Sequence, residues 1–340
     1  MAESVNCNLC GADDGQVLFR PSQSPGPVVR CRECGLVYVS PRENTKGITF
    51  EGPEIGNYPP RMLTSSDLDD LVGCWEKSLI EEEEAELSAK VVNAHRALDR
   101  IEQLMPYKGT ILNLGCFCGT FLHVAAERGW ASYGIEPLVG LAIYARAKFG
   151  LNVITDTLRD DSFPPEFFDV VTAFQVFEHL PDPLGELTRI WRILKPGGLL
   201  VVEVPNIDTV WMGLLGQHHR HFTADHLYFF SPQTLEALLG KAGFTVLKIQ
   251  AWPRTLSLRK VALWIGRASG VSFGKIIATV VRCLNLQDSM ITVNLGDIIC
   301  AFARKTAVRE GMPSLGGQWA AVGGREVRLA GGVLEAGRRV

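Results

Sequence analysis

Residues 110–119 constrain the fold of this chain more than any other stretch. The segment Thr110-Ile-Leu-Asn-Leu-Gly-Cys-Phe-Cys-Gly119 reads as a buried β-strand that breaks at Gly115 into a loop and then opens a helix. An acid, Glu136, follows at the end of a second predicted strand over residues 130–135. Glycine lets the backbone approach a ligand, and an acid at this place accepts both ribose hydroxyls. The pattern predicts an adenosine-containing cofactor at the carboxyl edge of a parallel sheet.

The glycine spacing separates two kinds of cofactor. A dinucleotide-binding turn requires Gly-x-Gly-x-x-Gly, which would place its later glycines at Phe117 and Thr120. Neither position is glycine. A nicotinamide-dependent sugar reductase is therefore the weaker interpretation, which fluorescence of the reduced cofactor would test.

Five blocks occur in order along the chain: Gly115-x-x-x-Gly119, Glu136, Asp156, residues 168–183 and residues 194–206. Together they resemble the class I S-adenosylmethionine-dependent methyltransferases over roughly residues 75–305. The resemblance implies an α/β fold, a Rossmann-like seven-stranded sheet with helices on both faces and an antiparallel last strand. It also implies an enzyme that transfers a methyl group to a small-molecule acceptor.

The resemblance assigns eight residues to S-adenosylmethionine: Asn113, Gly115, Cys116, Gly119, Glu136, Asp156, Phe174 and Gln175. The loop residues Gly115, Cys116 and Gly119 would pass the methionine part, and Glu136 would bind the ribose diol. Asp156 would lie near the adenine amino group, and Phe174 and Gln175 would lie beneath the cofactor.

Two positions depart from the family pattern. Asn113 stands where an acid is usual, and Phe117 stands where a glycine is usual. Both touch the expected cofactor site, so a non-catalytic protein that keeps the fold is the alternative from a different class. Cys116 and Cys118 are expected to fill a tight loop rather than to act as nucleophiles, because no catalytic histidine pairs with them in the sequence.

The acceptor side is expected in an insertion after the fifth strand, residues 206–230, because ligands of open α/β sheets bind beyond the carboxyl ends of the strands. Four of the seven histidines lie there: His218, His219, His221 and His226. His221 and His226 are the candidate general bases, since an imidazole takes protons near neutral pH. Loop anchoring is the other interpretation of His226. A second metal site at these histidines has no support from His-x-x-x-His spacing. Trp211, Met212, Phe222, Tyr228 and Phe229 are candidates for an apolar acceptor pocket or for core packing.

The first forty residues carry a repeated cysteine turn. Cys7-Asn-Leu-Cys10-Gly11 and Cys31-Arg-Glu-Cys34-Gly35 each place two thiols around a turn that ends in glycine. This is the spacing of a zinc ribbon, in which Cys7, Cys10, Cys31 and Cys34 would close a tetrahedral site. A closed site leaves no position for water, so the zinc is expected to be structural.

Composition narrows the class of protein. The chain has 340 residues, a net charge of −3 and 46% hydrophobic residues, and residues 1–60 hold five basic residues against seven acids. These values predict a globular protein without a basic field for nucleic acid. No signal peptide or transmembrane run is expected, and nine cysteines without an export signal favour a cytoplasmic protein with reduced thiols.

The expected organisation is a zinc ribbon at 1–40, a linker at 41–74, a methyltransferase domain at 75–304 and a disordered tail at 305–340. A helix is predicted over 75–105, with Glu81 to Glu84 on its solvated face, core helices over 261–286, and a last strand over 291–303.

The ribbon before such a domain resembles the sugar-nucleotide C-methyltransferases, although these usually carry a further carboxy-terminal domain. An O-methyltransferase that acts on a phenolic, quinone-like or lipid-linked acceptor is the other open interpretation. The sequence does not give the oligomeric state.

Overall fold

The structure, a computed structural model, describes residues 2–43, 73–269, 289–306, 319–322 and 325–328, with 279, 281, 283, 284 and 286 placed singly. Most of the expected linker at 41–74 and of the expected tail at 305–340 therefore lies outside the described residues. In the tail, the described strands β16 (Trp319–Val322) and β17 (Arg325–Arg328) pair antiparallel.

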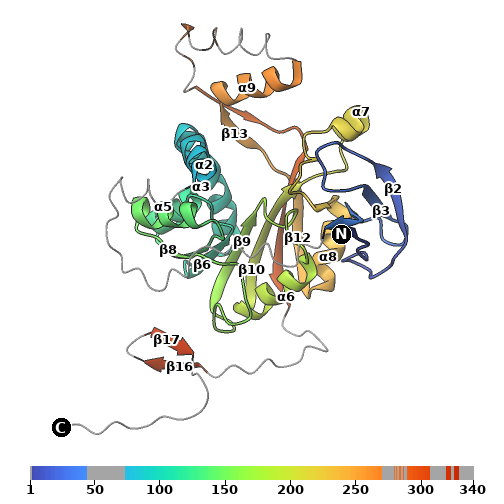
Figure 1. Cartoon of the computed structure of the whole chain (residues 1–340). Helices are drawn as coiled ribbons and strands as arrows, with labels where there is room; N and C mark the ends of the chain where they lie inside the picture. Colours follow the sequence, from blue (N-terminus) through green and yellow to red (C-terminus); the bar gives the residue numbers. More distant parts are fainter. Residues whose placement is uncertain are drawn as a thin grey trace, which may run out of the picture.

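A seven-stranded sheet forms the centre of the molecule (Figure 1). Its strands are β6 (Thr110–Leu114), β7 (Ala131–Ile135), β8 (Asn152–Ile154), β9 (Phe168–Phe174), β10 (Leu194–Pro205), β12 (Phe244–Ala251) and β15 (Ile298–Lys305). They lie in the order β12-β15-β10-β9-β6-β7-β8. The ladders from β10 to β8 are parallel, and β15 runs antiparallel to both β10 and β12. The predicted fold, with an antiparallel last strand, is confirmed.

Helices cover both faces of this sheet (Figure 1). Their bounds are α3 (Leu87–Leu104), α4 (Thr120–Glu127), α5 (Val139–Phe149), α6 (Pro183–Ile193) and α8 (Pro232–Lys241). Alternate residues of one strand face opposite sides, so Ile111 packs in the core with α3 and α4 while Leu112 packs in the core with α6 and α8. Both side chains are fully buried. Each face of the sheet therefore has its own apolar core.

The amino-terminal edge of the sheet is fixed by Asp169. Its Oδ2 accepts hydrogen bonds from Thr110 N at 2.8 Å and Thr110 Oγ1 at 3.0 Å, and it pairs with Lys195 Nζ at 2.8 Å. These bonds join the starts of β6, β9 and β10, far from the edge where the cofactor is expected.

The predicted helix over 75–105 is two helices. α2 (Cys74–Ala85) ends before Glu86, and α3 begins directly after it. Glu86 is buried and accepts hydrogen bonds from the backbone N and the hydroxyl of Ser257, which anchors the break. The expectation of a wholly solvated acidic face is also wrong at Glu83, which is buried and accepts a 2.7 Å hydrogen bond from Thr120 Oγ1.

An arm rises from the end of β12. It consists of β13 (Arg254–Ser257), α9 (Leu258–Ser269) and β14 (Met290–Val293), and Figure 1 shows β13 and α9 standing above the sheet. The single last strand predicted over 291–303 is wrong, because the chain turns at Gly296, whose φ is +71°, between β14 and β15. The helices predicted over 261–286 lie largely outside the described residues, and Leu263 of α9 is half exposed rather than in the core.

The cysteine-rich module joins the insertion in one small sheet. β2 (Gly15–Phe19), β3 (Val28–Cys31) and β4 (Val37–Val39) pair antiparallel, and β11 (Tyr228–Phe229) of the insertion continues this sheet beside β4. A separate pair joins β1 (Ala2–Glu3) to β5 (Arg42–Glu43). The insertion also holds α7 (Val210–Leu215) and the 3₁₀ turn η1 (Gly216–His218). The module and the insertion are thus packed as one body.

Candidate functional site

The loop after β6 is shaped by three left-handed residues. Gly115, Phe117 and Gly119 have φ values of +64°, +52° and +83°. A Cβ atom on Gly115 would lie 2.7 Å from a methyl carbon of Val176, and one on Gly119 would lie 2.6 Å from a methyl carbon of Leu151. Glycine is therefore required at both positions for space as well as for backbone conformation.

Glu136 faces this loop from the end of β7. It is 4% exposed, and its carboxylate accepts hydrogen bonds from Phe117 N at 2.8 Å and Leu138 N at 2.9 Å. Burial raises the pKa of Glu136 to about 7, opposed by these two N–H donors. The acid is thus held at the loop in a position to accept further hydrogen bonds.

Phe117 places its ring away from the β-sheet. The ring packs against a cluster between α2 and α5 that includes Ile80 and Tyr144, with Lys90 Nζ 5.6 Å from its centroid. The half-buried ring offsets part of the cost of a left-handed backbone, which is of the order of 1 kcal/mol or more for a residue with a Cβ atom.

The remaining predicted cofactor residues lie at or near the same edge. Asn113 is buried, and its Oδ1 accepts a 3.0 Å hydrogen bond from Thr172 Oγ1. Phe174 packs edge-on against Phe121 at 4.9 Å, and Gln175 has a φ of +56° and donates to Glu203 at 3.3 Å.

Asp156 follows β8 and pairs with Arg159 at 2.9 Å. The two loop cysteines are buried, and burial raises the pKa of the Cys116 and Cys118 thiols well above its usual value. Such thiols do not form thiolates near neutral pH, which favours the interpretation that they fill the loop.

The four amino-terminal cysteines converge. Their Sγ atoms lie within 4.8 Å of one another, with 3.4 Å between Cys7 and Cys34 and between Cys10 and Cys31. Both contacts are far longer than a disulfide bond of about 2.05 Å. The amides of Gly11 and Gly35 donate to the carbonyls of Cys7 and Cys31, so the two turns have one geometry. Four free thiols in this arrangement fit a tetrahedral zinc ion.

The insertion histidines have different surroundings. His218 is exposed and His219 is buried. His221 Nε2 lies 3.7 Å from Asp297 Oδ2, and Asp297 also pairs with Arg220. His226 donates from Nδ1 to the carbonyl of His221 at 2.9 Å. His221 and His226 come together, with ring centroids 6.3 Å apart; His221 faces Asp297, whereas His226 lies beside two other ionisable side chains.

Those side chains are Glu178 and His179, which sequence reasoning did not connect with the insertion. Among the described residues, the ligand atoms of Glu178, His179 and His226 lie within 4.8 Å of one another. Glu178 is fully buried. The adjacent acid and histidine in Phe177-Glu-His-Leu180 could have indicated a site. Their contact with His226 could not be predicted, because His179 and His226 are 47 positions apart in the sequence.

An open cavity of about 550 Å³ lies beyond the ends of β10 and β12. Trp211, Asn206 and Leu295 are among its lining residues. Of the five aromatic and apolar candidates, only Trp211 lines it; Met212, Phe222, Tyr228 and Phe229 are buried in the core. Val210 beside it is 77% exposed. None of the residues that line the cavity belongs to the glycine loop.

The strand order, the left-handed turn after the first strand and the acid after the second are those expected from the resemblance to the S-adenosylmethionine-dependent methyltransferases. Residues 87–249, just under half of the chain, match the family model described as "Methyltransferase domain".

Curated relatives agree with this class. A ubiquinone biosynthesis O-methyltransferase of Pseudomonas fluorescens is 29% identical over 152 residues, which are 41% of this chain and 66% of the relative. The corresponding proteins of Psychrobacter arcticus and Cereibacter sphaeroides are 29% and 30% identical, and the matches cover 58% and 62% of them. The chain thus matches less than two thirds of the length of these relatives.

The similarity to solved structures is weaker. A methyltransferase of Thermotoga maritima, described as a possible histamine N-methyltransferase, has a TM-score of 0.47 and 20% identity over 68% of this chain and 98% of that chain. One of Archaeoglobus fulgidus has a TM-score of 0.42 and 20% identity over 62% and 94%. In the described part of the chain, no helix combines the length and apolar character that crossing a membrane requires.

Proposed function

We propose that this chain transfers the methyl group of S-adenosylmethionine to a hydroxyl of a small acceptor with an apolar body. The observation that supports it best is the buried carboxylate of Glu136, held against a loop with three left-handed residues at the carboxyl edge of the sheet. A ribose diol at this carboxylate would donate two charge-assisted hydrogen bonds. The methionine part would follow the loop through Gly115, Cys116 and Gly119, and Asn113, Asp156, Phe174 and Gln175 would line the rest.

The protein promotes this reaction mainly by positioning the two reactants, and no covalent intermediate with the protein is required. The sulfonium carbon–sulfur bond breaks as the oxygen–carbon bond forms, the electron pair goes to sulfur, and the acceptor loses its hydroxyl proton. Alignment of the two reactants can supply roughly 7–11 kcal/mol of such a barrier. We propose that proton loss depends on His226, whose Nδ1 donates to the His221 carbonyl so that Nε2 is the nitrogen that can accept a proton, while His221 positions the loop through Asp297.

The acceptor class follows from the surface beside the insertion. Trp211, Val210 and Leu295 are 43%, 77% and 48% exposed, and all three line the cavity beyond β10. Apolar side chains gathered at an open cavity suit an acceptor with an apolar body better than a sugar nucleotide. The ubiquinone O-methyltransferase relatives agree with a phenolic or quinol hydroxyl. The cysteine-rich module, as a zinc ribbon over residues 1–40, would support this side through β4 and β11.

The decisive experiment combines calorimetric titration of S-adenosylmethionine with a labelled-methyl assay. The acceptor panel holds polyhydroxylated phenols, quinols and sugar nucleotides. We expect heat of binding, and label transfer to phenols or quinols. Replacing His226 with alanine should lower turnover by about 10²–10⁴-fold and leave cofactor affinity within a few-fold.

The exposed His218 serves as the matched control, and His218→Asn should keep wild-type turnover. Absence of cofactor heat would exclude the proposal. Heat without transfer to any acceptor would favour the non-catalytic alternative, and transfer to sugar nucleotides alone would contradict the acceptor class.

A further inference from the structure

The three side chains Glu178, His179 and His226 come from two segments that the backbone joins. Glu178 and His179 lie in the turn after β9, and His226 lies two residues before β11. The amides of Leu227 and Tyr228 both donate to the Glu178 carbonyl, at 2.7 and 3.1 Å. The rings of His179 and His226 are 4.7 Å apart at 78°. The cluster is therefore held by main-chain hydrogen bonds and is part of the fold.

Both imidazoles are oriented alike. His179 Nδ1 lies 3.0 Å from the carbonyl oxygen of Asp225, and His226 Nδ1 lies 2.9 Å from that of His221. A carbonyl oxygen only accepts, so each Nδ1 carries the proton and each Nε2 keeps its lone pair. A metal-binding histidine has this arrangement, with its outer N–H donating to a backbone carbonyl.

The third side chain is a carboxylate without a partner. Glu178 is fully buried, and within the described residues neither of its carboxylate oxygens has a hydrogen-bond partner. A buried polar group left unpaired costs free energy, and a carboxylate costs most. Glu203 and Asp225 add negative charge nearby, while Arg254, the neighbouring cation, pairs with Glu203 at 3.2 Å. The surroundings favour a cation.

We propose that Glu178, His179 and His226 bind a divalent cation of the first transition row. Two imidazoles and one carboxylate form a three-ligand set with coordination positions left open. Ligand atoms about 2.1 Å from one ion lie at most about 4.2 Å apart, so the observed spread of 4.8 Å or less needs only a small side-chain adjustment. The His179 side chain is 35% exposed and gives the site access to solvent.

This inference rests on the proposed function in one respect, which is that the open positions serve the acceptor. A hydroxyl oxygen bound there would lose its proton to solvent more readily, and His226 would act through the ion it binds. The binding site itself does not depend on that role.

The test uses Mn²⁺ as the probe, because oxygen and nitrogen ligands bind it while a site of four soft thiolates does not select it. Electron paramagnetic resonance of the full chain measures the free Mn²⁺ signal during titration. We expect one bound ion per chain, with affinity at least about tenfold weaker in Glu178→Gln and in His226→Ala, the size of effect typical of a damaged metal site. His218→Asn and Glu236→Gln, both at exposed positions, should bind as the wild type does.

If Glu178→Gln fails to fold, His179→Asn at the partly exposed ligand takes its place. Equal binding by wild type and ligand variants, or no saturable binding by wild type, would overturn the proposal. Mn²⁺ binding without cofactor heat would sink the proposed function and leave this site standing. Methyl transfer by a protein that binds no Mn²⁺ would overturn this site and leave the proposed function standing.

Discussion

At the scale of single residues, Phe117 is the least expected feature of the cofactor loop. Its backbone adopts φ +52°, a conformation that glycine accepts without the crowding a Cβ atom brings. The ring partly offsets this strain through contacts with the cluster between α2 and α5. The family pattern has glycine here, which adopts this backbone without strain. In this chain the Phe117 side chain instead links the loop to α2 through apolar contacts.

Two substitutions at residue 117 separate the effect of backbone strain from the effect of ring packing. Phe117→Gly and Phe117→Ala both remove the ring, but only alanine keeps a Cβ atom in the left-handed backbone. We expect the glycine variant to be more stable than the alanine variant by about 1 kcal/mol in urea unfolding. It should also bind S-adenosylmethionine as well as the wild type or better.

Equal stability of the two variants would show that the loop relaxes and that no strain is present at residue 117. A clear binding heat in Phe117→Gly with none in the wild type would mean that the ring closes the site, and the non-catalytic alternative would gain.

The pKa of Glu136 gives cofactor binding a pH dependence. Burial raises this pKa to about 7, so the carboxyl is largely protonated at pH 6 and largely ionised at pH 8. Only the ionised form accepts hydrogen bonds at both oxygens without donating. We therefore expect the dissociation constant of S-adenosylmethionine to fall by up to about tenfold from pH 6 to pH 8, as the ionised fraction grows.

Titration calorimetry across this range measures the effect, and Glu136→Gln should bind weakly with a flat profile. A rise in pH has the opposite effect on the contribution of Glu136 to stability. Because the folded pKa is raised, the contribution of Glu136 to the free energy of unfolding is fully present below its unfolded pKa near 4.5 and is lost as pH rises through 7. A wild-type affinity that does not change from pH 6 to pH 8 would remove Glu136 from the ribose site.

At the scale of elements, the sequence was most informative where the hydrophobic period and the helix-ending glycines agreed. The strand predicted to break at Gly115 ends as β6 at Leu114, and the strand predicted over 130–135 is β7 to within one residue. These segments are short and apolar, and they are bounded by Gly115 and Gly129, both with left-handed φ.

The failures have a common physical cause, which is long-range contact. The break at Glu86 is anchored by Ser257, 171 positions away, and no local pattern encodes that bond. The β13–α9–β14 arm was missed for the same reason, since Thr255 of β13 bonds to Asn93 of α3. The cluster of Glu178, His179 and His226 also depends on two segments meeting in space.

At the scale of the whole molecule, the proposed cofactor residues and the insertion lie at the same edge of the sheet. The proposed cofactor residues Glu136 and Gly115 to Gly119 lie at β6 and β7, while the insertion lies beyond β10 and pairs with the cysteine-rich module. The module has two apolar contacts: Val28 and Val39 pack with Met212 and Phe222 of the insertion, and Tyr38 belongs to the core that faces α6 and α8. We infer that damage to the module affects the acceptor side first.

Removal of zinc tests that inference. In Cys31→Ser the proposed tetrahedral zinc site would lose one of its four ligands, and structural zinc sites contribute roughly 10–16 kcal/mol to the folding of small modules. We expect elemental analysis to give one zinc per wild-type chain and none in the variant, and amide exchange over residues 2–43 to increase. β11 then loses its partner strand β4, so methyl transfer should fall by at least about tenfold, while Glu136 keeps cofactor affinity within a few-fold.

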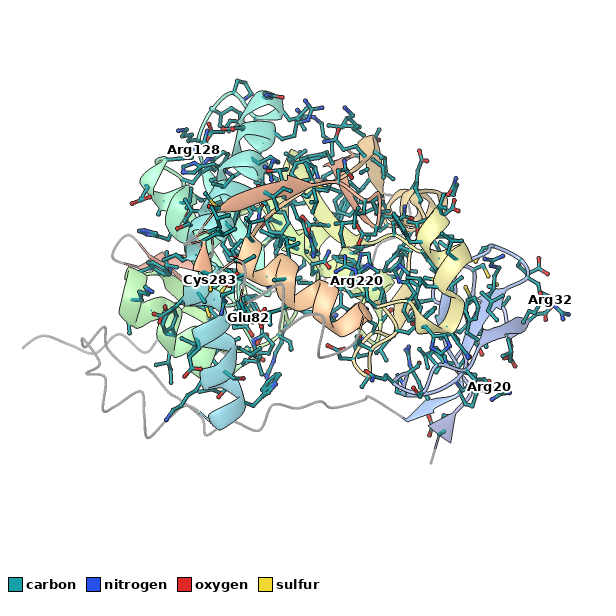
Figure 2. All side chains as sticks on the ribbon, turned by 90° about the horizontal axis from the view of Figure 1, so that it is seen from above. Arg20, Arg32, Glu82, Arg128, Arg220 and Cys283 are labelled. Carbon is teal, nitrogen blue, oxygen red and sulfur yellow. The ribbon has the colours of Figure 1, made fainter. Side chains whose placement is uncertain are left out.

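Cys283→Ser is the matched control, because this cysteine is exposed and lies outside the module (Figure 2). It should retain zinc, amide protection and turnover. Intact protection of residues 2–43 in a zinc-free preparation would show that the module folds without metal. A parallel loss of cofactor affinity in Cys31→Ser would show that the module and the cofactor site are coupled through the core, to which both Tyr38 of the module and Ile135, next to Glu136, belong.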